Sequence, residues 1–204
     1  MSTSQVRIPA GERRQQILDL ATELFARQGY QGTTTRQIAQ QVRVNEAIIF
    51  RHFPTKEELY WAVIENQIRI RAGRARLEAK LAAGGSDRDV LTAIAEELLS
   101  RDVTLSRLLL YTALENHELT HRFFRTHVAQ YLELLADFIR CGIAQGRFRD
   151  VDPLLAARGF LGMIVYHFQI QELFGGKRVQ TFDPQHVSAT LVDVWLHGME
   201  VPRS

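Results

Sequence analysis

Apolar residues recur at helical spacing along nearly the whole chain. One face of the first segment is apolar and consists of Ile17, Leu20, Ala21, Leu24 and Phe25. Intervals of three and four residues place such side chains on one stripe of a helix, which then faces the core. No run of useful length alternates between apolar and polar residues, as a half-buried strand would. The pattern predicts an all-α fold of about nine helices.

Turn and capping residues predict where the first helices end and begin. Gly29 is a stop signal after the last turn of the first helix. Thr34 and Gln37 have the spacing of a capping box, in which each side chain bonds the other's backbone amide. These residues predict a short second helix over about 35–42.

Pro54 separates the third predicted helix from the fourth. Asn45 is suited to cap the third helix, which ends at the proline because proline disfavours helical backbone in the residue before it. Thr55 and Glu58 form another capping box. They predict a long fourth helix that runs toward Leu81.

The remaining helices begin at similar signals. Gly84-Gly85 breaks the long helix, and the next starts are Ser86 with Asp89, Asp152-Pro153 and Asp183-Pro184. A long, very apolar helix is predicted from about 116 to 142. No Pro/Ser-rich linker occurs, so the helix from Thr55 is expected to join two parts rigidly, a domain over 1–54 and a larger one over 55–204.

Composition places the chain among globular proteins. With 46% hydrophobic and 24% charged residues it can bury a core, and its single cysteine, Cys141, excludes a disulfide within the chain. The first residues lack the apolar core of a signal peptide, and the most apolar stretch, 159–168, is too short to span a bilayer. We therefore expect a cytoplasmic protein with no membrane partner.

Charge is distributed unevenly, although the net charge is only +2. Residues 1–61 hold 8 Lys/Arg against 6 Asp/Glu, and the rest of the chain holds 17 of each. The excess of positive charge therefore lies in the first third, where a mild attraction to nucleic acid is expected.

Residues 34–53 are predicted to form two short helices with a tight turn, which is the geometry of a helix-turn-helix. The apolar positions that would pack this pair on the first helix are Ile38, Ala39, Val42, Val44, Ile49 and Phe53. The positions left for solvent are Arg36, Gln37, Gln40, Arg43, Asn45, Glu46, Arg51 and His52. Their donors and acceptors are of the kind that contact base edges and phosphates. The segment predicts DNA binding.

The stretch GYQGTTTRQIAQQVRVNEAIIFRHFPTKEELYWAVI resembles the DNA-binding region of the TetR (tetracycline-repressor) family. The shared features are the glycine-aromatic end of the first helix, the threonine-led second helix with Ile-Ala, the third helix ending in His-Phe, and the Lys-Glu-Glu-Leu entry to the fourth. The match covers about a third of the chain. It implies a regulator, most often a repressor, that binds a palindromic operator in double-stranded DNA as a homodimer and releases it on binding a small molecule.

The resemblance implies two kinds of DNA contact. Contacts that position the protein on phosphates are implied for Thr35, Arg51, His52 and Lys56. Contacts to base edges are implied for Arg36 and for the residues that open the recognition helix, namely Asn45, Glu46, Ala47 and Ile48. Arg36 is suited to guanine, whose O6 and N7 both accept, and Thr35 would hold its phosphate near a helix N-terminus.

Three residues depart from the family pattern and put the operator sequence in doubt. Arg43 stands in the turn where glycine is common; a left-handed backbone there would cost about 1 kcal/mol or more, offset by a new DNA contact. Phe50 lacks the hydroxyl of a common tyrosine. Glu46 replaces a small or basic residue, and its carboxylate repels phosphates but can accept from cytosine N4.

The last two helices combine small residues, which let helix axes approach, with branched and aromatic ones. The resemblance implies that these helices pair with their mates in a four-helix dimer interface, with contacts from Ala156, Gly159, Met163, Leu191, Val194 and Trp195. A simple core would explain the same residues. A dimer is favoured because two helix-turn-helix domains (the heads), one from each copy, are needed to reach half-sites one helical turn apart.

Polar tips on apolar stripes of the middle helices predict a pocket for a small, largely hydrophobic effector. The candidate residues are Leu109, Tyr111, Phe124, His127, Tyr131, Tyr166 and His167. Each of them, taken alone, is explained equally by a core position with a satisfied polar tip. Together, and with the resemblance, they indicate a ligand-binding domain.

An enzyme is the rival hypothesis, because His117-Glu118-Leu119-Thr120-His121 matches the zinc-protease pattern. The longer form of that pattern requires a glycine where Phe124 stands, and in an uninterrupted helix His127 lies off the face of His117. No nucleophile motif, phosphate-binding glycine loop or metal-type cysteine pattern occurs, so we expect neither catalysis nor a cofactor. A helical ligand-binding protein without DNA binding is the other alternative.

Overall fold

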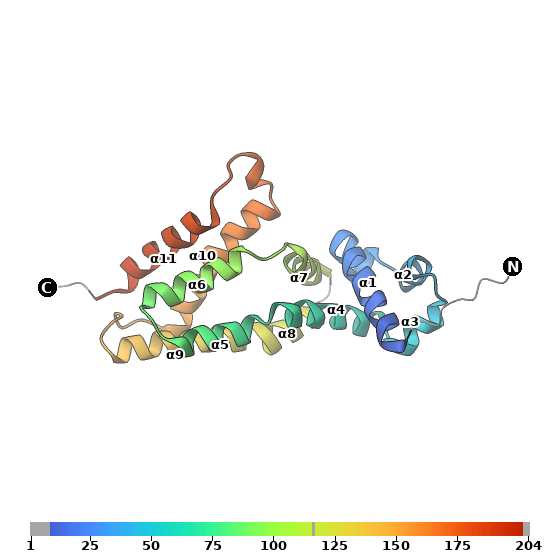
Figure 1. Ribbon diagram of the computed structural model, residues 1–204, viewed down its shortest axis with the longest axis horizontal. Coiled ribbons are helices and arrows are strands. Elements are labelled where there is room, and N and C mark those ends of the chain that lie inside the picture. Colours follow the sequence, from blue (N-terminus) through green and yellow to red (C-terminus); the bar gives the residue numbers. More distant parts are fainter. Residues whose placement is uncertain (1–8, 116, 202–204) are drawn as a thin grey trace. The chain divides into compact units, whose positions relative to one another are not determined.

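The computed structural model describes residues 9–115 and 117–201, except for the side chains of Arg71 and His117. Regular structure in these ranges is helical, which confirms the all-α fold (Figure 1). The helices are α1 (Ala10–Gly32), α2 (Thr35–Val42), α3 (Glu46–His52), α4 (Lys56–Arg71), α5 (Gly73–Ala83), α6 (Asp87–Leu99), α7 (Thr104–Glu115), α8 (His117–Phe123), α9 (Ala129–Ala144), α10 (Pro153–Glu172) and α11 (Pro184–Met199), with a π-helical turn (Phe124–Val128) and a 3₁₀ turn (Gly176–Arg178). No helix of the described residues is long and apolar enough to cross a membrane.

The chain forms two compact units. Unit 1 contains the residues up to Arg71 together with Thr104–Thr120, and unit 2 contains Ala72–Val103 and the residues from His121 onward. Within unit 1, helix α7 packs with α1 and α4. The boundary expected at 54/55 concerns the division of function and stays a prediction.

The capping signals in the sequence are confirmed. Both halves of the capping boxes are present at Thr34 with Gln37 and at Ser86 with Asp89. Asp152 and Asp183 each accept a hydrogen bond from the backbone amide three residues later, and the proline after each occupies the first helical position, where no amide is needed. These helix starts depend on local chemistry, and for that reason the sequence predicts them.

Two predicted long helices are interrupted, so their predicted continuity was wrong. The helix from Thr55 toward Leu81 breaks at Ala72, whose φ of 45° and ψ of 34° are left-handed, and α5 starts anew at Gly73. The helix expected over 116–142 contains the π-helical turn, which widens the helix over Phe124–Val128. The sequence signals for these breaks are weak, because alanine and phenylalanine are compatible with an α-helix and a lone glycine such as Gly73 is tolerated within one.

An aromatic cluster forms the centre of unit 1. The ring of Tyr60 on α4 packs edge-on against Phe25 and Tyr30 of α1, at centroid distances of 4.7 and 5.2 Å. Its hydroxyl donates to the carbonyl of Leu108 on α7 at 2.7 Å and accepts from the hydroxyl of Thr112 at the same distance. Burial raises the pKa of Tyr60 to about 12. This side chain therefore joins α1, α4 and α7.

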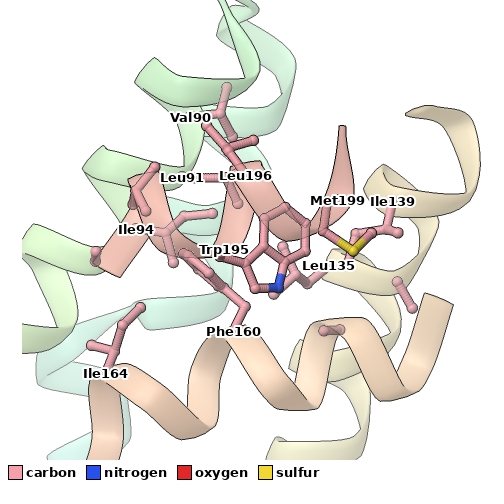
Figure 2. Packing of buried hydrophobic residues seen from close by; sticks show 14 of the residues in the cluster. Val90, Leu91, Ile94, Leu135, Ile139, Phe160, Ile164, Trp195, Leu196 and Met199 are labelled. Carbon is pink, nitrogen blue, oxygen red and sulfur yellow. The ribbon is translucent and has the colours of Figure 1, made fainter. Parts of the chain in front are cut away.

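Unit 2 has its own core between α6, α9, α10 and α11 (Figure 2). Trp195 of α11 packs edge-on against Phe148 and Phe160, and its indole N–H donates to the carbonyl of Ala156. Phe148 lies directly on Gly142 of α9, where a Cβ would come within 2.2 Å of the ring. The core therefore requires a residue without a side chain at position 142.

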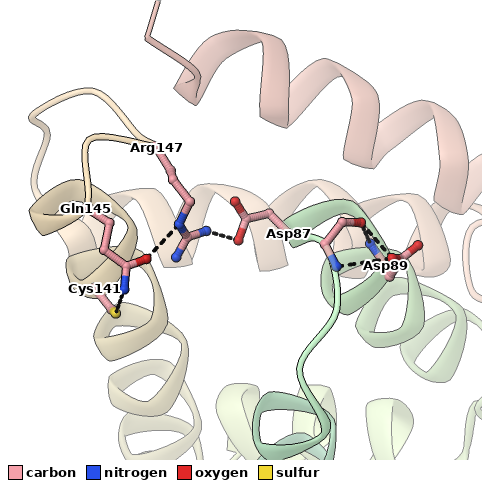
Figure 3. A network of polar contacts seen from close by, with 6 residues as sticks. Asp87, Asp89, Cys141, Gln145 and Arg147 are labelled. Atoms are coloured by element: carbon pink, nitrogen blue, oxygen red, sulfur yellow. Dashed lines mark hydrogen bonds and ion pairs between the residues drawn. The ribbon is translucent and has the colours of Figure 1, made fainter.

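A chain of polar contacts links α6 to the end of α9 (Figure 3). Arg147 donates to Asp87 in the first turn of α6 and to the side chain of Gln145, which donates to Cys141. The Arg147 guanidinium also lies 5.3 Å from the centre of the Phe148 ring. These contacts fix the loop after α9, so that Phe148 stays over Gly142.

Candidate functional site

Helices α2 and α3 form the predicted helix-turn-helix in unit 1 (Figure 1). Asn45 caps α3 by accepting from the amide of Ala47. The turn between the helices depends on Arg43, whose φ of 59° and ψ of 48° are left-handed, with its amide directed at the carbonyls of Ala39 and Gln40. The left-handed conformation that the sequence raised as a condition is therefore present, and its cost of about 1 kcal/mol applies.

The helix pair separates a buried face from a polar one. Ile38, Ala39, Ile49 and Phe53 are buried, while Val42 and Val44 are half-buried. The exposed side chains of the two helices and their turn include Arg36, Gln40, Arg43, Asn45, Ala47, Phe50 and Arg51; Ile48 and His52 are half-buried. Charged, amide and small apolar groups thus share one surface, which matches the chemistry of a major groove.

Thr35 and Glu46 are in contact, which the sequence did not predict. The hydroxyl of Thr35, the first residue of α2, donates to Oε1 of Glu46, the first residue of α3, at 2.5 Å. Both side chains are half-buried. Eleven positions separate them in the sequence, and only the crossing of the two helices brings them together. The contact places a negative charge at the start of both helices.

Lys56 lies against the end of α1. Its ammonium is 4.3 Å from the centre of the Tyr30 ring, a cation–π arrangement. Burial lowers the pKa of Lys56, and the nearby carboxylate of Glu115 acts in the opposite direction. This contact holds the ammonium beside the C-terminal end of α1.

Arg14 is a candidate DNA contact that sequence analysis missed. Its guanidinium lies 4.8 Å from the centre of the Phe53 ring, at the C-terminal end of α3, and the side chain is exposed. His52 lies beside the same ring, at a centroid distance of 6.4 Å. With exposed Arg51, these residues form a basic end to the recognition helix. The position of Arg14 near an aromatic residue 39 places later carries no sequence signal.

Helix α7 holds the C-terminal end of α1, where Gly29 has a left-handed φ of 77°. The carboxylate of Glu115 accepts from the backbone amide of Gln31 at 2.9 Å, and the hydroxyl of Tyr111 donates to the carbonyl of Arg27 at 3.4 Å. A Cβ at Gly29 would lie 2.7 Å from the Glu115 carboxylate and 2.8 Å from the Tyr111 ring. The connection from α1 to α2 is therefore built on α7.

The predicted effector residues fall in both units. Leu109 and Tyr111 belong to α7 in unit 1, whereas Phe124, His127, Tyr131, Tyr166 and His167 belong to unit 2. Tyr131 is mostly enclosed, and burial raises its pKa to about 12; Arg101 and Glu97 have opposing smaller effects. Burial also lowers the pKa of His167, whose ring packs edge-on against Phe182. His127 is half-buried and lies 5.6 Å from the Phe123 ring.

Tyr166 occupies a different environment from the other effector candidates. It is 63% exposed on α10, on one stripe with Leu155, Gly159 and Gly162, which are exposed as well. The core stripe of α10 lies on the opposite side of the helix and includes Phe160. Tyr166 thus shares a face with Gly159, which was assigned to the dimer interface.

The predicted interface residues divide between surface and core. Gly159 is exposed, Val194 is 58% exposed, and Ala156, Met163 and Leu191 are half-buried. Trp195 is only 7% exposed and packs within the core of unit 2, because the α11 stripe that carries it faces α6 and α10. A surface for a second copy must therefore rest on the other positions.

The zinc-protease pattern lies on α8. Glu118 and His121 are exposed, and the side chain of His117 lies outside the described residues. The helix does not continue regularly, as the sequence argument assumed, because the π-helical turn follows at Phe124. Among the side chains that the structure describes, no group of three His, Cys, Asp or Glu residues is arranged to hold a metal ion.

Some relatives match this chain over only about a third of its length, and others match it over nearly its whole length. A transcriptional regulator from Mycobacterium bovis is 40% identical over 67 residues, which are 32% of this chain and only 36% of that protein. A transcriptional repressor from Mycobacterium tuberculosis is 27% identical over 183 residues, 88% of this chain and 89% of that repressor. The structure of FadR from Bacillus subtilis in complex with stearoyl-CoA has the same fold, with a TM-score of 0.70 at 22% identity over 90% of this chain and 98% of FadR.

Two family models match consecutive parts of the chain. Residues 17–63 match the bacterial regulatory proteins of the tetR family, and residues 88–198 match the C-terminal domain of AefR-like transcriptional repressors. The first match falls on α1 to α4 with the helix-turn-helix, and the second covers more than half of the chain. The chain therefore belongs to the TetR family of bacterial transcriptional regulators.

Proposed function

We propose that this chain is a ligand-responsive transcriptional regulator that represses by binding a palindromic operator as a homodimer. One observation carries the proposal. The helix-turn-helix exposes Arg36, Arg43, Asn45 and Arg51 on a helix pair whose apolar side is buried and whose first helix, α2, packs against α1. Exposed donors next to a fixed recognition helix are what base and phosphate contacts require. Such a regulator is expected in the cytoplasm, where its operator lies.

We assign the contacts to DNA by residue type and by position on the helix pair. Arg36 is exposed one position after the start of α2, and we assign it to guanine O6 and N7. Arg51 and Arg43 are assigned to phosphates, together with His52 and Lys56. Asn45, Ala47 and Ile48 open α3 and face the major groove, where small apolar groups can contact a thymine methyl.

A homodimer is supported by the exposed apolar faces of α10 and α11. Leu155, Val165 and Tyr166 on α10 and Val194 on α11 are large side chains left in solvent by a single chain. If a second copy covers these side chains, their apolar area is removed from water, which favours association. Two heads held by such a surface reach successive half-sites on one side of the duplex.

The effector is proposed to be small and largely hydrophobic. FadR, which shares the fold, was solved with an acyl-CoA. Unit 2 of this chain supplies apolar helices with polar tips from Tyr131, His127 and His167. A thermal-shift panel of acyl-CoAs with short and long chains tests this part of the proposal, since a ligand that binds only the folded state raises the melting temperature.

Selection of binding sites from random duplex DNA tests the DNA-binding function. We expect a palindrome with half-sites about one helical turn apart, and affinity that falls steeply with salt. Enrichment of single half-sites would contradict the dimer while leaving the head intact. A folded protein that enriches no sequence at low salt would overturn DNA recognition, and the helical ligand-binding alternative would replace it.

A further inference from the structure

The contact between Thr35 and Glu46 changes what each residue can do on DNA. Thr35 was expected to hold a phosphate, but its hydroxyl hydrogen is committed to the Glu46 carboxylate at 2.5 Å. A phosphate brought to the same hydroxyl would also approach a negative charge, which is unfavourable. Thr35 is therefore poorly suited to the role that the sequence indicated.

Glu46 is placed where side chains of a recognition helix meet bases. It is the first residue of α3, directly after the cap Asn45, and the N-terminal residues of such a helix contact base edges. The hydrogen bond from Thr35 holds Oε1, whereas Oε2 accepts no hydrogen bond from the described residues. A half-buried carboxylate with one fixed oxygen has few conformations left, so its remaining acceptor has a defined direction.

An ionised carboxylate only accepts hydrogen bonds, which limits the bases that it can recognise. In the major groove the donors are N4 of cytosine and N6 of adenine. Adenine presents the acceptor N7 beside its donor, so a carboxylate there meets a lone pair, whereas cytosine presents no acceptor on that edge. The same geometry explains why amides, which both donate and accept, suit adenine.

We propose that Glu46 specifies a cytosine in each half-site and that Thr35 positions the Glu46 side chain, an inference that rests on the proposed function. The pair acts as one unit built from two helices. Thr35 contributes through Glu46 rather than through a phosphate, so its loss affects one base position and leaves the general attraction to DNA intact.

Site selection with variants of the full chain tests the proposal. The wild type should enrich cytosine at one position of each half-site, and Glu46→Gln should replace it with adenine there, each preferred over the other by about tenfold. Glu58→Gln is the matched control, since it removes the same charge from the exposed first turn of α4. It should retain the wild-type consensus.

Thr35 variants separate positioning from phosphate binding. Thr35→Val should lower the cytosine preference at that position several-fold without changing affinity for random DNA or its salt dependence, and Thr35→Ser should restore the preference. Circular dichroism melting establishes that each variant is folded. The proposal is overturned by an unchanged base in Glu46→Gln, or by an equal loss of specific and random binding in Thr35→Val. Absence of any enriched site for the folded wild type would instead overturn the proposed function itself.

Discussion

At the scale of single residues, Arg43 combines a conformational cost with a useful charge. Its left-handed backbone suits glycine better than arginine. We predict that Arg43→Gly raises the free energy of unfolding by roughly 0.5–1 kcal/mol, because glycine's greater freedom in the unfolded chain offsets part of the relief. The same variant should bind DNA more weakly and lower the salt slope by about one unit, since one phosphate contact is lost.

Urea unfolding and a binding titration at two salt concentrations measure both effects. Arg43→Asn is the control, because asparagine tolerates the left-handed region without carrying a charge. A glycine variant that is less stable than the wild type would show that the backbone at Arg43 is not strained. A glycine variant with unchanged DNA affinity would show that Arg43 does not contact DNA.

Ionisation of Tyr60 makes the free energy of unfolding decrease as the pH rises in the alkaline range. An unfolded tyrosine loses its proton near pH 10, whereas burial raises the pKa of Tyr60 to about 12 in the folded state. Between these values the unfolded state binds fewer protons, so stability falls as pH rises from 10 toward 12, by up to about 2 kcal/mol.

Urea unfolding at pH 9, 10 and 11 should therefore show a shallower pH slope for Tyr60→Phe than for the wild type. The phenylalanine variant also loses the bond to Leu108, which lowers stability at every pH, so the slope and not the absolute value is compared. Tyr131 has a similarly raised pKa and keeps part of the slope in this variant. Identical slopes would show that Tyr60 ionises normally in the folded protein.

At the scale of elements, the end of α1 depends on the absence of a side chain at Gly29. A Cβ there would meet both Glu115 and Tyr111 of α7, and the residue has a positive φ. Gly29→Ala is predicted to lower the free energy of unfolding by about 2–4 kcal/mol, since α7 must move or α1 must unwind. The comparison is Gly11→Ala in the same helix, where a Cβ has open space and the change should be neutral or mildly stabilising.

Thermal and urea unfolding of the two alanine variants provide the measurement. DNA affinity of Gly29→Ala, taken under conditions where it stays folded, should also fall because the start of α2 follows the displaced turn. Equal stabilities for the two variants would mean that α7 does not fix this end of α1.

The same elements show what the sequence can predict. Caps such as Thr34 with Gln37 are recognisable because both partners lie within one turn, and apolar stripes are recognisable because the helical period is fixed. The break at Ala72 is harder to recognise, because alanine favours helix and the lone glycine that follows, Gly73, is tolerated in helices. For the candidate site, residue types identified the exposed head, but the bond between Thr35 and Glu46 depends on how two helices cross.

At the scale of the whole molecule, the two proposed activities occupy different helices. The DNA-binding face belongs to α2 and α3, and the exposed apolar stripes belong to α10 and α11. Substitutions on one surface can therefore be made without touching the other. This separation allows dimerisation to be tested apart from DNA contact.

Val194→Lys is predicted to dissociate the proposed dimer while leaving each chain folded. Val194 is 58% exposed in the single chain, so lysine costs the monomer little, but in a dimer interface it would bury a charge on both copies. Light scattering should then report a monomer at concentrations where we expect the wild type to be a dimer. The affinity for a full palindrome should fall to that for one half-site, because the gain from linking two heads is lost.

Leu114→Lys is the matched control, because Leu114 is an 85% exposed apolar residue on α7 and belongs to neither of the two proposed surfaces. It should remain a dimer with wild-type affinity. If Val194→Lys also remains a dimer, the exposed stripes of α10 and α11 have another use. If it becomes monomeric yet still binds the palindrome as tightly as the wild type, the two heads assemble on DNA without this surface, and the operator itself provides the dimer.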